Sequence, residues 1–257
     1  MKRIIFLSIS VIALSLTLAL PAWSDSASIL TNENLPPEFE ASYEIYKNSL
    51  RVGEMQVSLK KVGEELIYES KTKPVGMAAF FLGDQTINDR AVLKQINNRY
   101  RTIEFKHEMN DKKKNRNEHY LFDWDNNTAS VKYKDESKIL DITEHTFDNY
   151  SAQLLLMRES PQVSGNDDSK LTYSVISKGR LKQYEYQQEN SELVSTKLGD
   201  FDSNKYVRKK DNDKKTTYLG WYADKLNYLP VKLDKYENGK LDVSVQITAI
   251  KWLNESL

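Results

Sequence analysis

Histidine is the side chain that most often serves as an acid–base catalyst or metal ligand near neutral pH, and the chain has three, at His107, His119 and His145. None is followed by a second histidine at the spacings that zinc-binding strands and helices use. His107 falls on the apolar face of an alternating segment, where we interpret it as a core residue. His119 follows Glu118, but neighbouring strand residues point to opposite faces. The histidines therefore predict no metal site.

Nucleophilic and phosphate-binding motifs are also absent from the sequence. The chain has no cysteine, which excludes thiol nucleophiles, thiolate zinc sites and iron–sulfur clusters. It contains no G-x-S-x-G motif and no glycine-rich phosphate loop. Residues 123–134 resemble a calcium loop, but Thr128 replaces the required glycine and Lys134 the bidentate glutamate, so a hairpin turn explains them better. We predict no catalytic residue, no metal and no cofactor, although paired carboxylates for glycoside hydrolysis leave no sequence signature.

The charged residues balance in sign, with 37 basic and 37 acidic side chains in the whole chain. A nucleic-acid-binding protein would show a basic excess on at least one face, so we expect no nucleic-acid partner. Two basic runs, at residues 112–116 and 208–215, are interleaved with Asp and Asn. We interpret them as solvated hairpin tips. The alternative is that they contact phosphate or anionic lipid head groups, which would make the protein peripheral to a membrane at most.

The beginning of the chain has the pattern of a secretory signal. Two basic residues precede an apolar stretch at 4–20, Pro21 ends it, and Ala22 and Ser24 supply small side chains at the two positions that a signal peptidase reads. We expect a signal peptide at residues 1–24, cleaved before Asp25, and a periplasmic mature protein. A retained membrane anchor is the alternative, but the stretch is slightly short for a spanning helix.

The remainder of the chain alternates between apolar and polar residues with the period of a β-strand. Residues 25–37 are polar and end in two prolines, so we expect a short tether there, followed by a single domain at 38–257. The last predicted strand, at 241–249, alternates most clearly. About ten to twelve such segments are spaced as in an antiparallel meander. Parallel strands buried on both faces would instead give continuous apolar runs, which the sequence lacks.

Two segments break this alternation. Residues 147–159 have apolar residues at helical spacing behind Asp148, a good N-cap, and Ser160–Pro161 should end this helix. Residues 74–82 (PVGMAAFFL) form an apolar patch that we expect to be a short helix or a buried loop. We predict a mainly β fold, with a strongly curved antiparallel sheet (an open barrel or half-barrel) of about ten to twelve strands around one central helix.

Aromatic residues are frequent, with 15 tyrosines and four tryptophans. On strands they mainly reflect β-propensity and core packing, but they could also line a pocket for an apolar or sugar-bearing ligand. Under that second interpretation, either of the two non-alternating segments supplies a lid. The candidate ligand-binding residues are Met77, Phe80, Phe81, Trp124, Leu155 and Trp221, with Tyr222 as a further aromatic candidate.

Several short motifs along the chain resemble those of one bacterial family. They are Leu35–Tyr43, Arg51–Glu54, Asp148–Ser151, Lys178–Arg180 with Tyr184, and a closing set of Gly199, Trp221, Leu229–Val231 and the last strand. Over about residues 35–250 the chain resembles the bacterial envelope proteins grouped as domain of unknown function 3108. The resemblance implies an exported, mostly antiparallel β-protein of a Gram-negative envelope, with no catalytic residues to transfer. Its architecture is also similar to periplasmic carriers such as lipoprotein-sorting chaperones, an analogy of fold alone.

Three classes of function stay open at this point. The first is a non-catalytic periplasmic binding or carrier module whose ligand is a lipid or the acyl chain of a lipoprotein. The alternative is a structural or accessory protein that acts through contact with an envelope protein partner, and the third is a hydrolase acting on envelope glycans or lipids. An empty apolar cavity would favour the carrier, a filled interior the accessory protein, and converging polar side chains with perturbed pKa values the enzyme.

Overall fold

The computed structural model describes residues 30–31, 35–83, 85–111, 115–163, 170–210 and 213–253. The predicted signal peptide at 1–24 lies outside these residues, as does most of the predicted tether at 25–37. Leu30, within that tether, is buried, and its carbonyl accepts a hydrogen bond from the Tyr100 backbone N–H over 2.7 Å. The segment ahead of the first strand therefore contacts the domain at Leu30.

A single sheet of 15 strands makes up most of the described chain. The first group of strands is β1 (Phe39–Lys47), β2 (Leu50–Val62), β3 (Glu65–Pro74), β4 (Ile87–Ile96), β5 (Arg99–Met109), β6 (Glu118–Asp123), β7 (Thr128–Tyr133) and β8 (Glu136–Asp141). The second group is β9 (Thr146–Phe147), β10 (Lys170–Ser177), β11 (Arg180–Thr196), β12 (Gly199–Lys210), β13 (Asp213–Ala223), β14 (Leu229–Glu237) and β15 (Lys240–Trp252). The helix α2 (Asn149–Val163) lies between β9 and β10 in the sequence.

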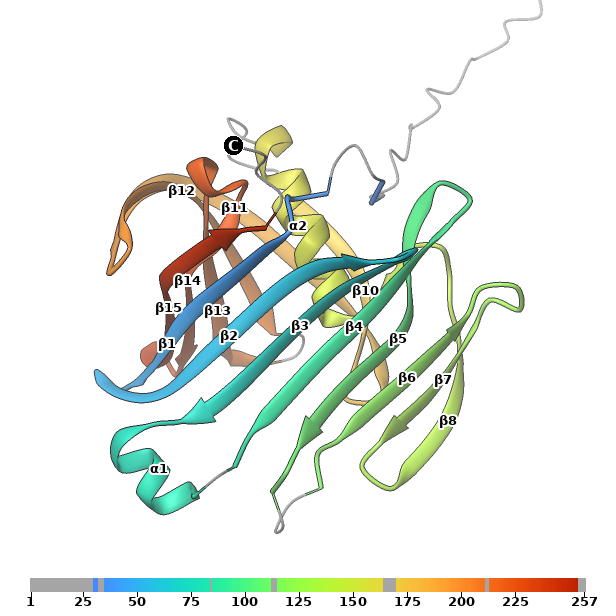
Figure 1. Cartoon of the computed structure of the whole chain (residues 1–257), viewed down its shortest axis with the longest axis horizontal. Coiled ribbons are helices and arrows are strands. Elements are labelled where there is room, and N and C mark those ends of the chain that lie inside the picture. Colours follow the sequence, from blue (N-terminus) through green and yellow to red (C-terminus); the bar gives the residue numbers. More distant parts are fainter. Residues whose placement is uncertain are drawn as a thin grey trace, which may run out of the picture.

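The strand order places the start of the domain in the middle of the sheet. β1 pairs with β2 on one side and with β15 on the other, antiparallel in both cases. From β1 the chain runs outward strand by strand to β8, crosses to β9 at the other edge, passes through α2 inside the curve, and returns from β10 to β15 (Figure 1). β8 and β9 form the two edges, so the sheet is a strongly curved, open structure and not a closed barrel.

The predicted architecture, mainly β with one large curved sheet, is confirmed, but the expected strand count of about ten to twelve is wrong. The sheet has 15 strands. Most side chains of β8 and of the second half of β11 are exposed, so these segments lack the one-sided apolar alternation on which the prediction relied. β9 has only two residues and is too short to give a periodic signal.

Helix α2 begins where the sequence predicts, directly after Asp148. The carboxylate of Asp148 accepts hydrogen bonds from the backbone N–H groups of Tyr150 (2.7 Å) and Ser151 (3.2 Å), and the Ser151 hydroxyl accepts one from the Asp148 N–H (3.0 Å). The helix ends at Val163, past the predicted stop at Ser160–Pro161. Pro161 lacks the N–H that would bond to the preceding turn, and the Asn204 side chain donates to the Ser160 carbonyl over 3.0 Å, which satisfies one acceptor of the last turn.

Helix α2 fills part of the space inside the curve. Its buried apolar side chains are Ala152, Leu154, Leu155, Leu156 and Met157. These residues cover more than one face of the helix, which is expected for a helix that the sheet surrounds on several sides. None of the helices in the described part of the chain is long and apolar enough to cross a membrane.

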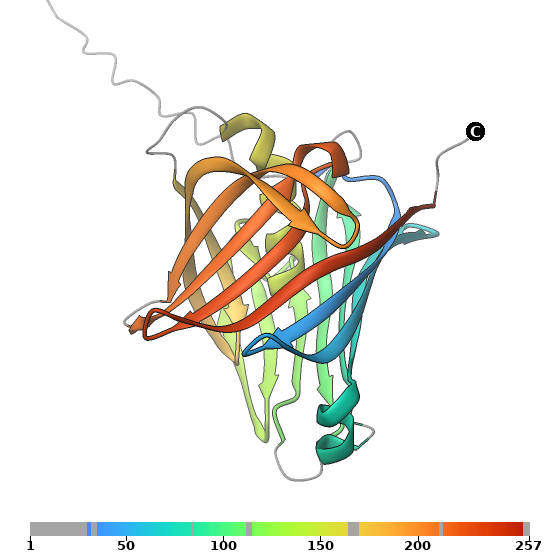
Figure 2. The same cartoon turned by 90° about the vertical axis from the view of Figure 1, so that its left-hand side faces the viewer.

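The far half of the β11–β12 hairpin covers part of the outer face of the sheet (Figure 2). Lys197 at the hairpin tip forms an ion pair with Glu44 of β1 over 2.6 Å. Glu192 of β11 accepts a hydrogen bond from the indole N–H of Trp221 on β13. Trp221 is therefore buried on the outer face, and the alternation of the strand turns its neighbour Tyr222 toward the concave face.

The β10–β11 turn bridges toward the other half of the sheet. The Lys178 N–H donates a hydrogen bond to the Glu118 carboxylate over 2.7 Å, and the Gly179 N–H donates one to the Tyr120 hydroxyl over 3.1 Å. Gly179 has a φ of 69°, and a Cβ there would lie 2.8 Å from the Cβ of Tyr133. Glycine thus allows both the left-handed turn and the close approach to β7.

Candidate ligand-binding cavity

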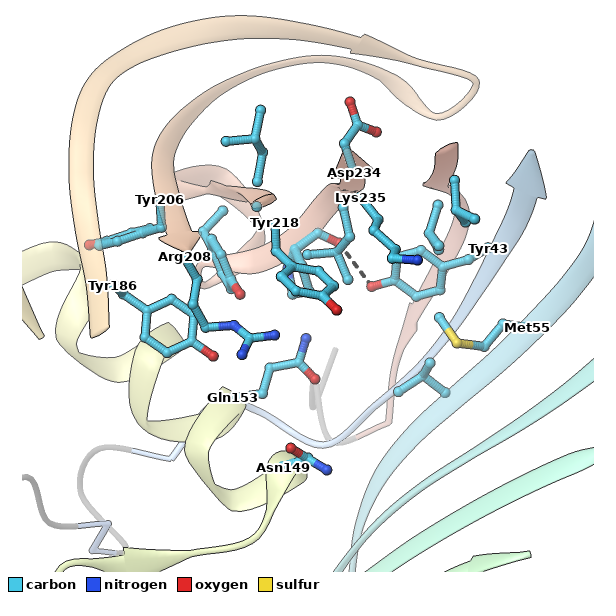
Figure 3. A pocket seen from close by; sticks show the side chains of 18 of the residues that line it. Tyr43, Met55, Asn149, Gln153, Tyr186, Tyr206, Arg208, Tyr218, Asp234 and Lys235 are labelled. Atoms are coloured by element: carbon cyan, nitrogen blue, oxygen red, sulfur yellow. Dashed lines mark hydrogen bonds between the residues drawn. The ribbon is translucent and has the colours of Figure 1, made fainter. Parts of the chain in front are cut away.

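A cavity of about 370 Å³ lies between the first turns of α2 and the concave face of the sheet. Its walls come from β1 to β3, β11 to β15 and α2. The helix does not reach across the whole curve, so this part of the interior stays unfilled (Figure 3). A volume of this size is at the lower end of the range for small-molecule sites, about 300–1,000 Å³.

The cavity lies toward the end of the sheet where the β14–β15 turn is found. Val243 and Lys235, which both line the cavity, pair across these strands close to that turn. The short helix α1 (Gly76–Leu82) lies toward this end, because the Val75 N–H just before it donates to the Val52 carbonyl near the start of β2. The cavity and α1 therefore share one end of the molecule.

One wall of the cavity is aliphatic. Met55 and Val57 extend from β2, and Val243 and Val245 from β15, with Leu233 of β14 beside them. The register explains the grouping: Leu233 pairs with Val245, and paired residues of neighbouring strands share one face. This wall offers an apolar contact surface, with the Lys235 side chain beside Val243.

Seven of the lining residues are tyrosines, at positions 43, 68, 150, 186, 206, 218 and 222. Burial raises the pKa of Tyr43, Tyr150 and Tyr222 well above the usual value, so these phenols stay protonated at neutral pH. Tyr43 donates a hydrogen bond to the Pro230 carbonyl over 2.9 Å, and Tyr68 donates one to Oε1 of Gln153 on α2 over 2.9 Å. The tyrosines thus join the sheet to the helix and supply neutral donors around the cavity.

Gly220 creates space for one of these rings. A Cβ at this position would lie 2.8 Å from Cε2 of Tyr222 and 3.2 Å from Cδ2 of Leu233. The absence of a side chain at Gly220 therefore lets the Tyr222 ring lie along β13 without a clash.

Two cations line the cavity, and they differ in their surroundings. The Lys235 ammonium lies 2.5 Å from a Glu237 carboxylate oxygen and 3.1 Å from one of Asp242. The Arg208 guanidinium lies between two aromatic rings, 4.0 Å from the Tyr184 centroid and 4.3 Å from the Tyr218 centroid. Lys235 is therefore neutralised by carboxylates, whereas Arg208 is held by rings.

The polar groups gather at one side of the cavity. Figure 3 shows Arg208, Tyr186, Gln153 and Asn149 together, with Met55 on the opposite side. Asp234, the one acidic residue of the lining, points away from this group; its carboxylate lies 3.2 Å from the Lys232 ammonium. The cavity thus has a polar side at Arg208 and a mainly aliphatic side, where the one cation, Lys235, is already paired with carboxylates.

None of the six main candidate residues from the sequence is among those that line the cavity. Leu155 is buried in the packing of α2, and Trp221 is buried on the outer face of the sheet. Trp124 stacks on Phe122 with ring centroids 5.6 Å apart, and its indole N–H donates to the Thr102 carbonyl over 2.8 Å. Their role in ligand contact stays a prediction.

The other three candidates form an exposed apolar surface on α1. Met77, Phe80 and Phe81 are 72%, 81% and 76% exposed, and α1 has no buried residue. The predicted apolar segment at 74–82 is therefore a short helix rather than a buried loop. Its side chains extend away from the domain, at the same end as the cavity. Tyr222, the further aromatic candidate, does line the cavity.

A useful signal for the cavity was present in the sequence. Tyr184, Tyr186, Arg208 and Tyr218 belong to strands whose alternation places tyrosine or arginine where apolar residues would form a core. The structure pairs Tyr186 with Arg208, and Arg208 with Tyr218, on one face of the sheet. Polar aromatic residues on the concave face of adjacent strands mark a site that water or a ligand reaches.

A second polar cluster lies beyond Tyr150. His107 Nδ1 is 2.7 Å from Asp89 Oδ1, the Ser70 hydroxyl is 3.4 Å from Asp89 Oδ2, and the same hydroxyl is 2.5 Å from the Tyr150 hydroxyl. Hydrogen bonding to Asp89 raises the pKa of His107. A serine hydrolase needs histidine between serine and aspartate, whereas here Asp89 lies between the other two, so the order of that triad is not met.

His107 is partly buried and is not among the fully buried core residues, and its hydrogen bond to Asp89 is a relation between two strands that the sequence did not reveal. His119 Nε2 contacts Glu104 over 2.8 Å, and His145 lies 3.6 Å from Glu144. Among the residues that the structure describes, no group of three His, Asp or Glu side chains is placed to hold a metal ion.

The fold is similar to that of a solved structure from Brucella abortus, a β-barrel-like protein of domain of unknown function DUF1849. The TM-score is 0.58 at 9% sequence identity, and the similarity covers 86% of this chain and 99% of the other. A protein with a YmcC-like fold from Bacteroides fragilis is less similar, with a TM-score of 0.39, 15% identity and coverage of 88% and 99%. At such low sequence identity, the similarity to the first protein shows that the two chains share a β-barrel-like fold. It carries no information about activity.

The sequence also matches a family profile. No curated protein sequence matches the chain. The family described as protein of unknown function (DUF3108) matches residues 41–245, which include every cavity-lining strand and α2. Because this match covers most of the chain, the protein belongs to the DUF3108 family.

Proposed function

We propose that the protein is a non-catalytic binding or carrier module for a hydrophobic ligand of the cell envelope, such as a lipid or the acyl chain of a lipoprotein. The observation that carries this proposal is the unfilled cavity of about 370 Å³ inside the curved sheet. A single apolar core normally packs to the density of an organic crystal, so an unfilled interior of this size calls for a ligand or for water.

The walls of the cavity favour an apolar ligand. The aliphatic side formed by Met55, Val57, Val243 and Val245 gains hydrophobic free energy of about 25 cal/mol per Å² of ligand surface that it removes from water. The cavity holds one alkyl chain or a small amphiphile, not a whole phospholipid. A longer ligand would extend past the cavity toward α1, where Phe80 and Phe81 offer further apolar surface.

The proposal includes export and maturation. We infer that residues 1–24 are removed as a signal peptide and that the mature protein, one domain at 38–257 behind a short tether, works in the periplasm. Cleavage before Asp25 keeps Leu30, whose side chain is buried against the domain. A signal-peptide cleavage site is thus compatible with the packing of the segment that follows it.

A fluorescence titration tests the proposal. The purified mature chain, stripped of lipid, is titrated with a neutral apolar dye whose emission rises in an apolar site. We compare it with Val245→Phe, which adds a phenyl ring to the cavity wall, and with Val62→Phe, the same substitution at an exposed position of β2. Saturable dye binding that is weakened about tenfold by Val245→Phe and unchanged by Val62→Phe supports the cavity as the binding site.

Two outcomes would contradict the proposal. Dye binding that both variants leave unchanged would place the apolar site elsewhere on the protein. No saturable binding by the wild-type chain would favour the alternative, an accessory protein that acts by contact with another envelope protein.

A further inference from the structure

Arg208 is a cation without a carboxylate partner. Among the residues that the structure describes, no acidic side chain forms an ion pair with its guanidinium within 4.0 Å. Its central carbon lies over the rings of Tyr184 and Tyr218, and no carboxylate among the described residues takes up its N–H donors. A partly buried arginine in this setting is ready to bind an anionic group from outside the protein.

The groups around Arg208 are donors. Gln153 accepts the Tyr68 hydroxyl with its carbonyl oxygen, which leaves its amide N–H groups toward the cavity. The hydroxyls of Tyr186 and Tyr218 have no hydrogen-bond partner among the described residues. Burial raises the pKa of Tyr186, so this phenol stays a donor at neutral pH. No described acidic side chain of the cavity lining points at this group, since Asp234 is directed away.

We propose that the cavity recognises an anionic amphiphile: the guanidinium of Arg208 binds one carboxylate or phosphate group, and the aliphatic wall binds the attached apolar chain. This inference rests on the proposed function and names the class of ligand. Arginine fits both anions because its N–H donors match two oxygens at once. The polar and aliphatic sides of the one cavity set the orientation of the ligand, with its anionic group at Arg208 and its chain toward Met55.

The test compares four probes on the mature chain by titration calorimetry: dodecanoate, dodecyl phosphate, the neutral dodecanol, and inorganic phosphate. The variants are Arg208→Gln, which removes the positive charge, and Arg208→Lys, which keeps the charge but lacks the planar guanidinium that can bind two oxygens at once. Lys205→Gln is the matched control, because Lys205 is a cation of the same strand that contacts Trp221 on the outer face.

We expect the wild-type chain to bind both anionic amphiphiles at least about tenfold more tightly than dodecanol. Arg208→Gln should remove this preference, so that the variant binds both anionic amphiphiles no more tightly than dodecanol, and its urea unfolding curve shows that it is folded. Arg208→Lys should retain part of the preference, and Lys205→Gln all of it. Inorganic phosphate should bind far more weakly than dodecyl phosphate, because it lacks the chain.

Several results would overturn the inference. One is an anionic preference that survives in Arg208→Gln; another is a wild-type chain that binds dodecanol as tightly as dodecanoate. Both leave the proposed carrier function intact, because an apolar chain still binds. Inorganic phosphate that binds as tightly as dodecyl phosphate would indicate a plain anion site. If no amphiphile binds at all, the proposed function fails together with this inference.

Discussion

The hydroxyl of Tyr68 on β3 donates a hydrogen bond to Oε1 of Gln153 on α2 over a distance of 2.9 Å. The Tyr68 ring is fully buried and also contacts Tyr150, with ring centroids 4.8 Å apart. These contacts hold the first turns of the helix to one side of the curved sheet. The space left on the other side is the cavity that Tyr68 and Gln153 themselves line.

A double-mutant cycle on this pair measures how firmly the helix is held. Tyr68→Phe removes the donor and Gln153→Leu the acceptor, and we expect a coupling energy of about 1 kcal/mol between them, because the hydrogen bond is shielded from water. Urea unfolding of the four proteins gives the value. Strictly additive losses would show that this hydrogen bond does not fix the helix.

Gly220→Ala should reduce both stability and ligand capacity. The new Cβ would lie 2.8 Å from the Tyr222 ring, so the ring must move into the cavity or the strand must shift. Overpacking of this kind costs about 1–3 kcal/mol in unfolding free energy. Denaturant unfolding and dye titration measure the two effects. Normal stability with normal dye binding would contradict the close packing of Tyr222 on β13.

Substitutions at Leu155 and at the α1 phenylalanines should differ strongly in how much they lower the free energy of unfolding. Leu155→Ala leaves a cavity in the buried packing of α2 and should lower the free energy of unfolding by about 2–5 kcal/mol. Phe80→Ser combined with Phe81→Ser changes exposed side chains, and the loss should be at most about 0.5 kcal/mol per site. Urea unfolding measures both. Global unfolding of the α1 variant would show that these rings are core residues.

The same α1 variant also tests the proposed ligand contact outside the cavity. A reduced retention of long-chain ligands, with unchanged binding of a short apolar dye, is the expected result. Equal retention of long and short ligands would remove α1 from the proposed binding surface.

The His107–Asp89 pair makes stability depend on pH. The pKa of His107 is raised in the folded protein, so its protonation stabilises the fold fully below its unfolded pKa of about 6.5. That contribution is lost as pH rises through the folded pKa. The wild-type free energy of unfolding, relative to His107→Gln, should therefore fall as pH is raised through the range that begins at about 6.5. Urea unfolding across this range checks the sign, with His145→Gln as the control, and parallel curves for wild type and His107→Gln would contradict it.

Much of the fold follows from local patterns in the sequence. The alternation of strands such as β15 and the Asp148 cap depend only on neighbouring residues, so both were predictable. Strand β8 and the second half of β11 were not, because their exposed polar residues on both faces erase the alternation. The number of strands therefore depends on hydrogen-bonded neighbours that a single segment does not reveal.

The cavity was harder to predict than the fold. Arg208 and Tyr186 meet because β11 and β12 pair in one register, and register is a relation between strands. The apolar residues of α1 form a cluster in the sequence and were therefore predicted to contact the ligand, yet Phe80 is 81% exposed. Trp221 is adjacent to the cavity residue Tyr222, but alternation places it on the outer face.

The central claim is that the interior of the sheet holds an apolar ligand. Native mass spectrometry of the mature protein, purified gently from the periplasm, tests it most directly, with Val245→Phe as the comparison. We predict a reproducible mass above that of residues 25–257, an adduct that solvent extraction releases as lipid and that Val245→Phe diminishes. A wild-type mass equal to the polypeptide alone would contradict the account.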